Sequence, residues 1–181
     1  MEPVLISKTA IARNPWSPWR NGSSRWSAKG NSLAEILDSL CRLVEAQAGD
    51  VLASILLVDG GHLRHGAPSL PKAYTDAIDG TVIGPSAGSC GTAAYRGEQV
   101  IVEDIATDPL WADYRDLALP HSLCACWSTP VFSSQGEVIA TFAMYYGEPH
   151  RPTQRDQEVI LIGQDQAVRN ELGDGRDAGL V

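Results

Sequence analysis

The fold is decided by the stretch Gly84-Pro-Ser-Ala-Gly-Ser-Cys-Gly-Thr-Ala-Ala-Tyr-Arg-Gly-Glu-Gln-Val-Ile-Val-Glu-Asp-Ile105. It begins with a turn of small residues, continues as a short helix that Gly97 ends, and leads into a β-branched strand, Val100–Val102. Such a turn leaves backbone N–H groups free at the helix N-terminus, where they can bind an anion or another small polar group. Cys90 lies there, where the pKa of a thiol tends to fall. We therefore expect the rest of the chain to be a scaffold around this turn.

Composition restricts the possible partners of the protein. The chain has 181 residues, 44% of them hydrophobic, which is enough for one core. Its net charge of -8 and pI near 4.9 argue against nucleic acid and against an anionic membrane surface, because both repel an acidic protein. No apolar run approaches the roughly 20 residues of a membrane span, and the N-terminus does not read as a secretory signal.

The four cysteines point to a reducing compartment. Cys41, Cys90, Cys124 and Cys126 are too few and too unevenly spaced for a disulfide framework, so we expect a cytoplasmic protein. The spacing Cys124-Ala-Cys126 is not a usual metal-ligand spacing, so we expect no metal site.

Both ends of the chain differ in composition from its middle. Residues 1–30 are rich in Trp and Pro and show no helix or strand period, which predicts a flexible leader; alternatively, one of its Trp side chains docks on the domain or on a partner. Residues 173–181 look like a disordered tail. One domain over residues 31–172 lies between them.

The pattern within this domain predicts an α/β (α+β) fold. We expect a mainly antiparallel sheet of five to six strands, with the long helices Ser32–Ala48 and Thr153–Leu172 on one face. Short helices and loops between Ser69 and His121 then cover a pocket on the other face. The expected strands are Ala53–Val58, His62–His65, Val100–Val102, Cys124–Phe132 and Val138–Tyr146, and shorter helices are expected over Ser69–Ile78 and from Asp108.

This order of elements resembles a GAF domain, a small-molecule sensor module of signalling proteins. The resemblance covers roughly Ser32 to Leu161. Its most specific part is Gly88-Ser-Cys-Gly-Thr-Ala-Ala-Tyr, followed by Val102-Glu-Asp-Ile, Asp108-Pro-Leu-Trp and Ala125-Cys-Trp-Ser-Thr-Pro. These motifs resemble a subgroup found in bacterial sensors beside PAS, histidine-kinase and diguanylate-cyclase domains, and a GAF-type nitrate receptor. The chain departs from that subgroup in carrying Ser122 and Cys124 where Gly and Arg are usual.

The resemblance implies a non-enzymatic sensor that signals to a partner protein. The ligand, for example a small anion such as nitrate, would bind between the sheet and Leu70–His121. The partner would be a sensor kinase or another protein of two-component or cyclic-nucleotide signalling, and the terminal helices would form a homodimer. A pure interaction module without a ligand is a further alternative. The residues predicted to line the ligand site are Ser89, Cys90, Gly91, Thr92, Trp111, Tyr114, His121 and Trp127.

Several of these residues have alternative interpretations. Cys90 can be a packed small residue, a pocket-lining residue, or an activated thiol such as the one in GAF-fold free methionine sulfoxide reductases, for which Cys124 and Cys126 are not at the expected partner position. Trp127 alternates with Cys126 on its strand, so only one of the two faces the pocket. A haem would need an axial His, such as His121 or His65, but nothing else favours haem, so no cofactor is expected.

Overall fold

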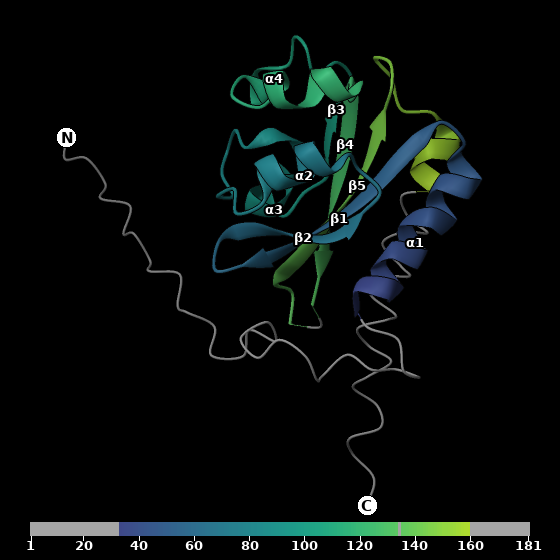
Figure 1. The fold of residues 1–181 in the computed structure, drawn as a ribbon. Helices are drawn as coiled ribbons and strands as arrows, with labels where there is room; N and C mark the ends of the chain where they lie inside the picture. The colour runs from purple at the N-terminus through teal and green to yellow at the C-terminus, as the bar shows by residue number, and fades with distance from the viewer. Residues whose placement is uncertain (1–32, 134, 160–181) are drawn as a thin grey trace, which may run out of the picture.

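A computed structural model describes residues 33–133 and 135–159 of the chain. Its central element is one antiparallel sheet of five strands in the order β2-β1-β5-β4-β3 (Figure 1). The predicted leader and tail, and most of the predicted closing helix, lie outside the described residues. The strands are β1 (Val51–Asp59), β2 (His62–Pro68), β3 (Val100–Val102), β4 (Ala125–Phe132) and β5 (Val138–Tyr146).

The helices divide between the two faces of this sheet. α1 (Leu33–Ala48) covers one face, and the described start of the closing helix, residues 154–159, lies near it (Figure 1). The short helices lie on the opposite face, between β2 and β4 in the chain. They are α2 (Lys72–Ile78), α3 (Gly88–Arg96), the 3₁₀ helix η1 (Pro109–Trp111), α4 (Arg115–Ala118) and the 3₁₀ helix η2 (Leu119–His121).

Each face of the sheet has its own hydrophobic core. Because side chains alternate along a strand, neighbouring residues of β4 and β5 contribute to different cores. The core beneath α1 includes Val44, Trp127 and Phe142, and the core beneath α3 includes Cys126 and Tyr145. The α+β fold with an antiparallel sheet is therefore confirmed, with five strands.

Local signals account for most element bounds. Gly97 ends α3 with a left-handed φ of 66°, and its N–H bonds to the carbonyl of Ala93, as expected for a glycine C-cap. The strands Val100–Val102 and Val138–Tyr146 have the predicted bounds. The helix predicted from Asp108 is instead two short pieces, η1 and α4, because the Asp108 side chain caps only one 3₁₀ turn before the chain bends at Tyr114.

Candidate functional site

The first turn of α3 packs directly on β4. The Ser89 hydroxyl donates to the carbonyl of Cys126 (3.0 Å) and accepts from the indole N–H of Trp111 (3.0 Å). All three residues are buried. One serine therefore joins α3, η1 and β4, three elements that are distant in the sequence.

Close packing also explains Gly91. A Cβ at this position would lie 2.6 Å from the Cβ of Ala87, which is shorter than real contacts allow. The Thr92 hydroxyl accepts a hydrogen bond from the backbone N–H of Ala87 (3.1 Å), which closes the same turn. The small residues of the Gly88–Thr92 segment thus allow the chain to form a tight turn against the sheet.

Cys90 lies in a cluster of thiol and hydroxyl groups. Its sulfur is 3.6 Å from the hydroxyl of Tyr145, which is the cross-strand partner of Cys126. The Cys126 thiol, with smaller contributions from the Ser128, Tyr145 and Thr141 hydroxyls, lowers the pKa of Cys90 to about 7 although burial opposes this. Burial, together with the neighbouring Cys90, raises the pKa of Cys126. Cys90 is therefore the thiol of this pair that ionises first.

Three hydroxyls on the same face of the sheet lack hydrogen-bond partners. Ser54 on β1 and Ser128 on β4 pair with Ala143 of β5 from opposite sides, and Thr141 precedes Ala143 by two residues. All three side chains are fully buried (0% exposed), and their hydroxyl oxygens have no partner within the described part of the chain. Ser128 and Thr141 lie near enough to Cys90 to contribute to the lowered pKa of its thiol. An unpaired buried hydroxyl is costly, so this cluster requires a physical explanation.

No cationic side chain of the described residues is among these hydroxyls. Arg42, Arg64, Lys72 and Arg151 form ion pairs with carboxylates, each partly exposed. The remaining described basic residues are Arg96, which is exposed on α3, and Arg115 and Arg155, which donate to backbone carbonyls. The described part of the chain also contains no group of three or more His, Cys, Asp or Glu side chains that could hold a metal ion.

The structure gathers most of the predicted site residues beside this cluster. Ser89, Cys90, Gly91, Thr92 and Trp111 are all buried around the first turn of α3. Two others are only partly buried: Tyr114 packs at the edge of the same core, and His121 meets the ring of Tyr74 edge-on, with centroids 6.4 Å apart.

The assignment of Trp127 to the ligand site requires correction. Its side chain lies in the core beneath α1, on the opposite face of the sheet from α3, because the alternation of β4 turns Cys126 toward α3 instead. The sequence reasoning left Cys126 as the alternative to Trp127, and it missed Ser54, Ser128, Thr141 and Tyr145. Polar side chains on one face of an otherwise apolar strand, such as Thr141 and Tyr145 four residues apart on β5, were the available signal.

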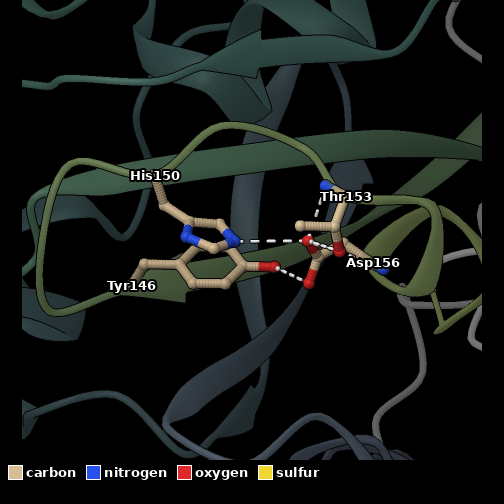
Figure 2. A network of polar contacts seen from close by, with 4 residues as sticks. All are labelled: Tyr146, His150, Thr153 and Asp156. Carbon is tan, nitrogen blue, oxygen red and sulfur yellow. Dashed lines mark hydrogen bonds and ion pairs between the residues drawn. The ribbon is translucent and has the colours of Figure 1, made fainter.

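A second polar group lies beyond the other face of the sheet, where the chain leaves β5. We call Tyr146, His150, Thr153 and Asp156 the Asp156 cluster (Figure 2). The Asp156 carboxylate accepts from the Tyr146 hydroxyl (3.1 Å) and from the Thr153 N–H (2.8 Å), and it lies 3.2 Å from His150 Nε2. The Asp156 N–H donates back to the Thr153 hydroxyl (3.3 Å), which completes a capping box at the start of the closing helix.

Aromatic stacking ties the Asp156 cluster to the sheet. The His150 ring stacks on Tyr146 (centroids 4.2 Å apart) and on Trp127 (5.2 Å). Burial raises the pKa of Asp156, but the hydrogen bonds from Thr153, His150 and Tyr146 outweigh it and lower the pKa below its usual value. Because Trp127 and Tyr146 directly follow Cys126 and Tyr145, the two faces of the sheet are linked through two pairs of adjacent residues.

The sheet, the face covered by α1 and the opposite face covered by short helices define an α+β domain of the GAF type. The chain belongs to the GAF domain family, because the family's model matches residues 30–166, more than half of the chain. A methyl sulfide methyltransferase-associated sensor from Methanosarcina acetivorans is 39% identical over 136 residues, which are 74% of this chain and 14% of that relative. The chain thus corresponds to a small part of that protein.

Solved structures share the fold. A domain assigned to a two-component sensor histidine kinase from Sinorhizobium meliloti superposes with a TM-score of 0.62 at 21% identity, over 81% of this chain and 93% of that one. The reduced form of fRMsr from Staphylococcus aureus superposes with a TM-score of 0.61 at 16% identity, over 79% and 86%. Within residues 33–133 and 135–159, no helix has the length and apolar content that crossing a membrane requires.

Proposed function

We propose that this GAF domain senses a small polar molecule bound between the sheet and the segment Leu70–His121. The observation that carries the proposal is the group of unpartnered, fully buried hydroxyls of Ser54, Thr141 and Ser128. A polar ligand would supply the hydrogen bonds that these groups lack. The ligand would meet the sheet below and the first turn of α3 above. Its other neighbours would be Ser89, Cys90, Gly91, Thr92 and Trp111, with Tyr114 and His121 at the edge.

Binding of a ligand at the buried hydroxyls would be coupled to a movement of the covering segment Leu70–His121. The three hydroxyls are closed to solvent, so a ligand reaches them only when the covering segment moves. A ligand that binds the opened arrangement more tightly shifts the population toward it. This coupling is what a sensor requires, because a partner protein can distinguish the two arrangements.

The signal would leave through the Asp156 cluster and the terminal helices. The rings of Trp127 and Tyr146 contact each other and the other residues of this cluster. The residues that precede them in the chain, Cys126 and Tyr145, face the proposed ligand site on the other side of the sheet. The recipient would be a sensor kinase or another protein of two-component or cyclic-nucleotide signalling in the cytoplasm, and α1 with the closing helix would form a homodimer. The 39% identity to a sensor supports a signalling role, and the net charge of -8 disfavours nucleic acid or a membrane as partner.

The chemistry of the site bears on the nature of the ligand. The hydroxyls both donate and accept hydrogen bonds, and none of the described Lys or Arg side chains is among them. An anion such as nitrate would therefore depend on the backbone N–H groups at the start of α3 and on the hydroxyl donors. Nitrate remains the first anion to test, and uncharged polar molecules belong beside it.

Ligand screening by thermal shift tests the proposal. The full chain is screened with nitrate, nitrite, halides, urea, cyclic nucleotides and haem, and each compound that raises Tm is repeated on Ser128→Ala and Ser39→Ala. Ser39 is the matched control because it lies exposed on α1. We expect at least one compound to raise Tm in the wild type and in Ser39→Ala but less in Ser128→Ala. If no compound raises Tm, or the shift is equal in all three proteins, the proposal fails.

A thiol-dependent reductase is the second candidate. The pKa of the Cys90 thiol is lowered, and Cys126 lies in the same core as a second thiol. The near-complete burial of Cys90 (6% exposed) argues against turnover at this thiol. The assay incubates the protein with free methionine-R-sulfoxide and dithiothreitol and measures methionine. We expect no turnover above that of Cys90→Ser. Turnover that is lost in Cys90→Ser would establish the enzyme instead.

A further inference from the structure

Cys90 and Cys126 are the two cysteines of the described residues that lie in the core beneath α3. The hydrogen bond from Ser89 to the Cys126 carbonyl (3.0 Å) holds the first turn of α3 on β4, and Cys90 is the next residue of that turn. Both side chains belong to the core beneath α3, where the Cys126 thiol is the neighbour that lowers the pKa of Cys90 most. The register pairs Cys126 with Tyr145, whose hydroxyl contacts the Cys90 sulfur. Two thiols and a tyrosine hydroxyl thus form one compact group.

The other two cysteines provide a contrast within the same chain. Cys41 lies in the core beneath α1, across the sheet, where burial raises the pKa of its thiol to about 12. Cys124 is partly exposed just before β4. Its backbone N–H and carbonyl bond to Tyr146 and Ile105. Oxidation follows thiolate character and access to the oxidant. The pKa of Cys90 is lowered and that of Cys41 is raised, and because Cys90 is 6% exposed, a peroxide reaches it when the covering segment moves.

The unpartnered hydroxyls provide an independent observation on the same sulfur. Ser128 and Thr141 are fully buried, have no hydrogen-bond partner and lie near Cys90. An O–H group can donate to a thiolate or to the oxygen of a sulfenic acid at this place. The surroundings of Cys90 therefore favour an anionic or oxidised sulfur over an inert packed thiol.

We propose that Cys90 and Cys126 form a redox-responsive dithiol that hydrogen peroxide converts to a disulfide. The Cys90 thiolate attacks one oxygen of the peroxide: the S–O bond forms, the O–O bond breaks, and the leaving hydroxide takes up a proton to become water. The Cys126 sulfur then attacks Cys90: the S–S bond forms, the S–O bond breaks, and the second water carries away the Cys126 proton. Two thiols lose two electrons, and the peroxide gains them.

The disulfide would restrict the movement of the segment that covers the sheet. It ties α3 covalently to β4 and so opposes the movement of the covering segment away from the sheet. In a reducing compartment such a bond is transient, as expected for a redox sensor and not for a structural disulfide. The inference does not depend on the proposed small-molecule site, because the chemistry needs only the two thiols and the peroxide.

Peptide mapping of the full chain tests this proposal. The reduced protein is freed of reductant, treated with hydrogen peroxide, blocked with iodoacetamide and digested without reduction. We expect an intramolecular peptide pair joining Cys90 to Cys126, lighter by two hydrogens and removed by dithiothreitol. We also expect Cys90 to lose alkylation about tenfold faster than Cys41, because the pKa of Cys90 is lowered by its neighbours and that of Cys41 is raised by burial.

Two variants complete the test. The double variant Cys41→Ser/Cys124→Ser should still form the disulfide, and Cys126→Ser should stop at a sulfenic acid that dimedone captures on Cys90. Mapping of the wild type alone decides the matter if a variant does not fold. A disulfide through Cys124, a link between two chains, or equal loss of Cys90 and Cys41 would each overturn the proposal. A failed ligand screen would leave this result unaffected, which separates it from the proposed function.

Discussion

Replacing Asp156 by Ala tests the Asp156 cluster most directly. The carboxylate accepts from the Tyr146 hydroxyl (3.1 Å), the Thr153 N–H (2.8 Å) and the Thr153 hydroxyl (2.5 Å), and it lies 3.2 Å from His150 Nε2. Its side chain is only 14% exposed, so water cannot replace all of these contacts. Val159, on the same helical segment, is buried in the core beneath α1, so loosening the segment lowers the free energy of global unfolding.

The magnitude follows from the kinds of contact that are lost. Removing a helix cap costs about 1 kcal/mol. Leaving the Tyr146 hydroxyl without its charged acceptor costs about another 1–2 kcal/mol, since the ring is buried and partial rehydration recovers some of the loss. We therefore expect Asp156→Ala to lower the free energy of unfolding by about 2–3 kcal/mol at pH 7. Tyr146→Phe alone should cost about 1 kcal/mol.

Urea denaturation of both single variants and the double variant measures these values. The control is Asp113→Ala, because Asp113 is exposed and should change stability by less than about 0.5 kcal/mol. In the Asp156→Ala background, Tyr146→Phe should cost almost nothing, because its acceptor is already gone. A destabilisation by Asp156→Ala no larger than that of the control, or strict additivity of the two changes, would refute this account of the cluster.

The pH dependence of stability provides a second measurement on the same cluster. The pKa of Asp156 in the folded protein lies below its usual value of 3.8. The carboxylate therefore stabilises the fold fully above the unfolded-state pKa, and this stabilisation is lost as the pH falls through the lower folded-state pKa. The stability difference between wild type and Asp156→Ala should thus be constant from neutral pH to about pH 5 and shrink below about pH 4. A difference that instead shrinks between pH 7 and 5 would contradict this assignment.

Three further predictions concern the face beneath α3, each measured by urea denaturation. Trp111→Phe keeps most of the buried ring but removes the indole N–H bonded to Ser89, so we expect a loss of about 1–2 kcal/mol; equality with wild type would show that this bond contributes nothing. Gly91→Ala places a Cβ 2.6 Å from that of Ala87 and should cost about 1–3 kcal/mol, whereas Gly84→Ala, with open space around it, should be nearly neutral. Ser128→Ala should stabilise the ligand-free protein by about 0.5–1 kcal/mol because it removes an unpartnered buried hydroxyl; clear destabilisation would mean that the hydroxyl has a partner.

The sequence alone determined the elements whose causes are local. The apolar period over residues 33–48 predicted α1, the β-branched run predicted β3, and the glycine at position 97 predicted the end of α3. Periodicity and capping act within a few residues, so they can be read from a chain in isolation. The same local reasoning placed the first turn of α3 at the centre of the candidate site.

Only the tertiary structure decided which side chains meet. Alternation along β4 showed that Cys126 and Trp127 face opposite ways, but the packing of α3 on one face was needed to tell which of them meets Cys90. The order β2-β1-β5-β4-β3 brings Ser54 and Ser128 to either side of Ala143, although 74 positions separate these serines in the sequence. Such contacts depend on strand order and register, which are properties of the whole sheet, and no short segment encodes them.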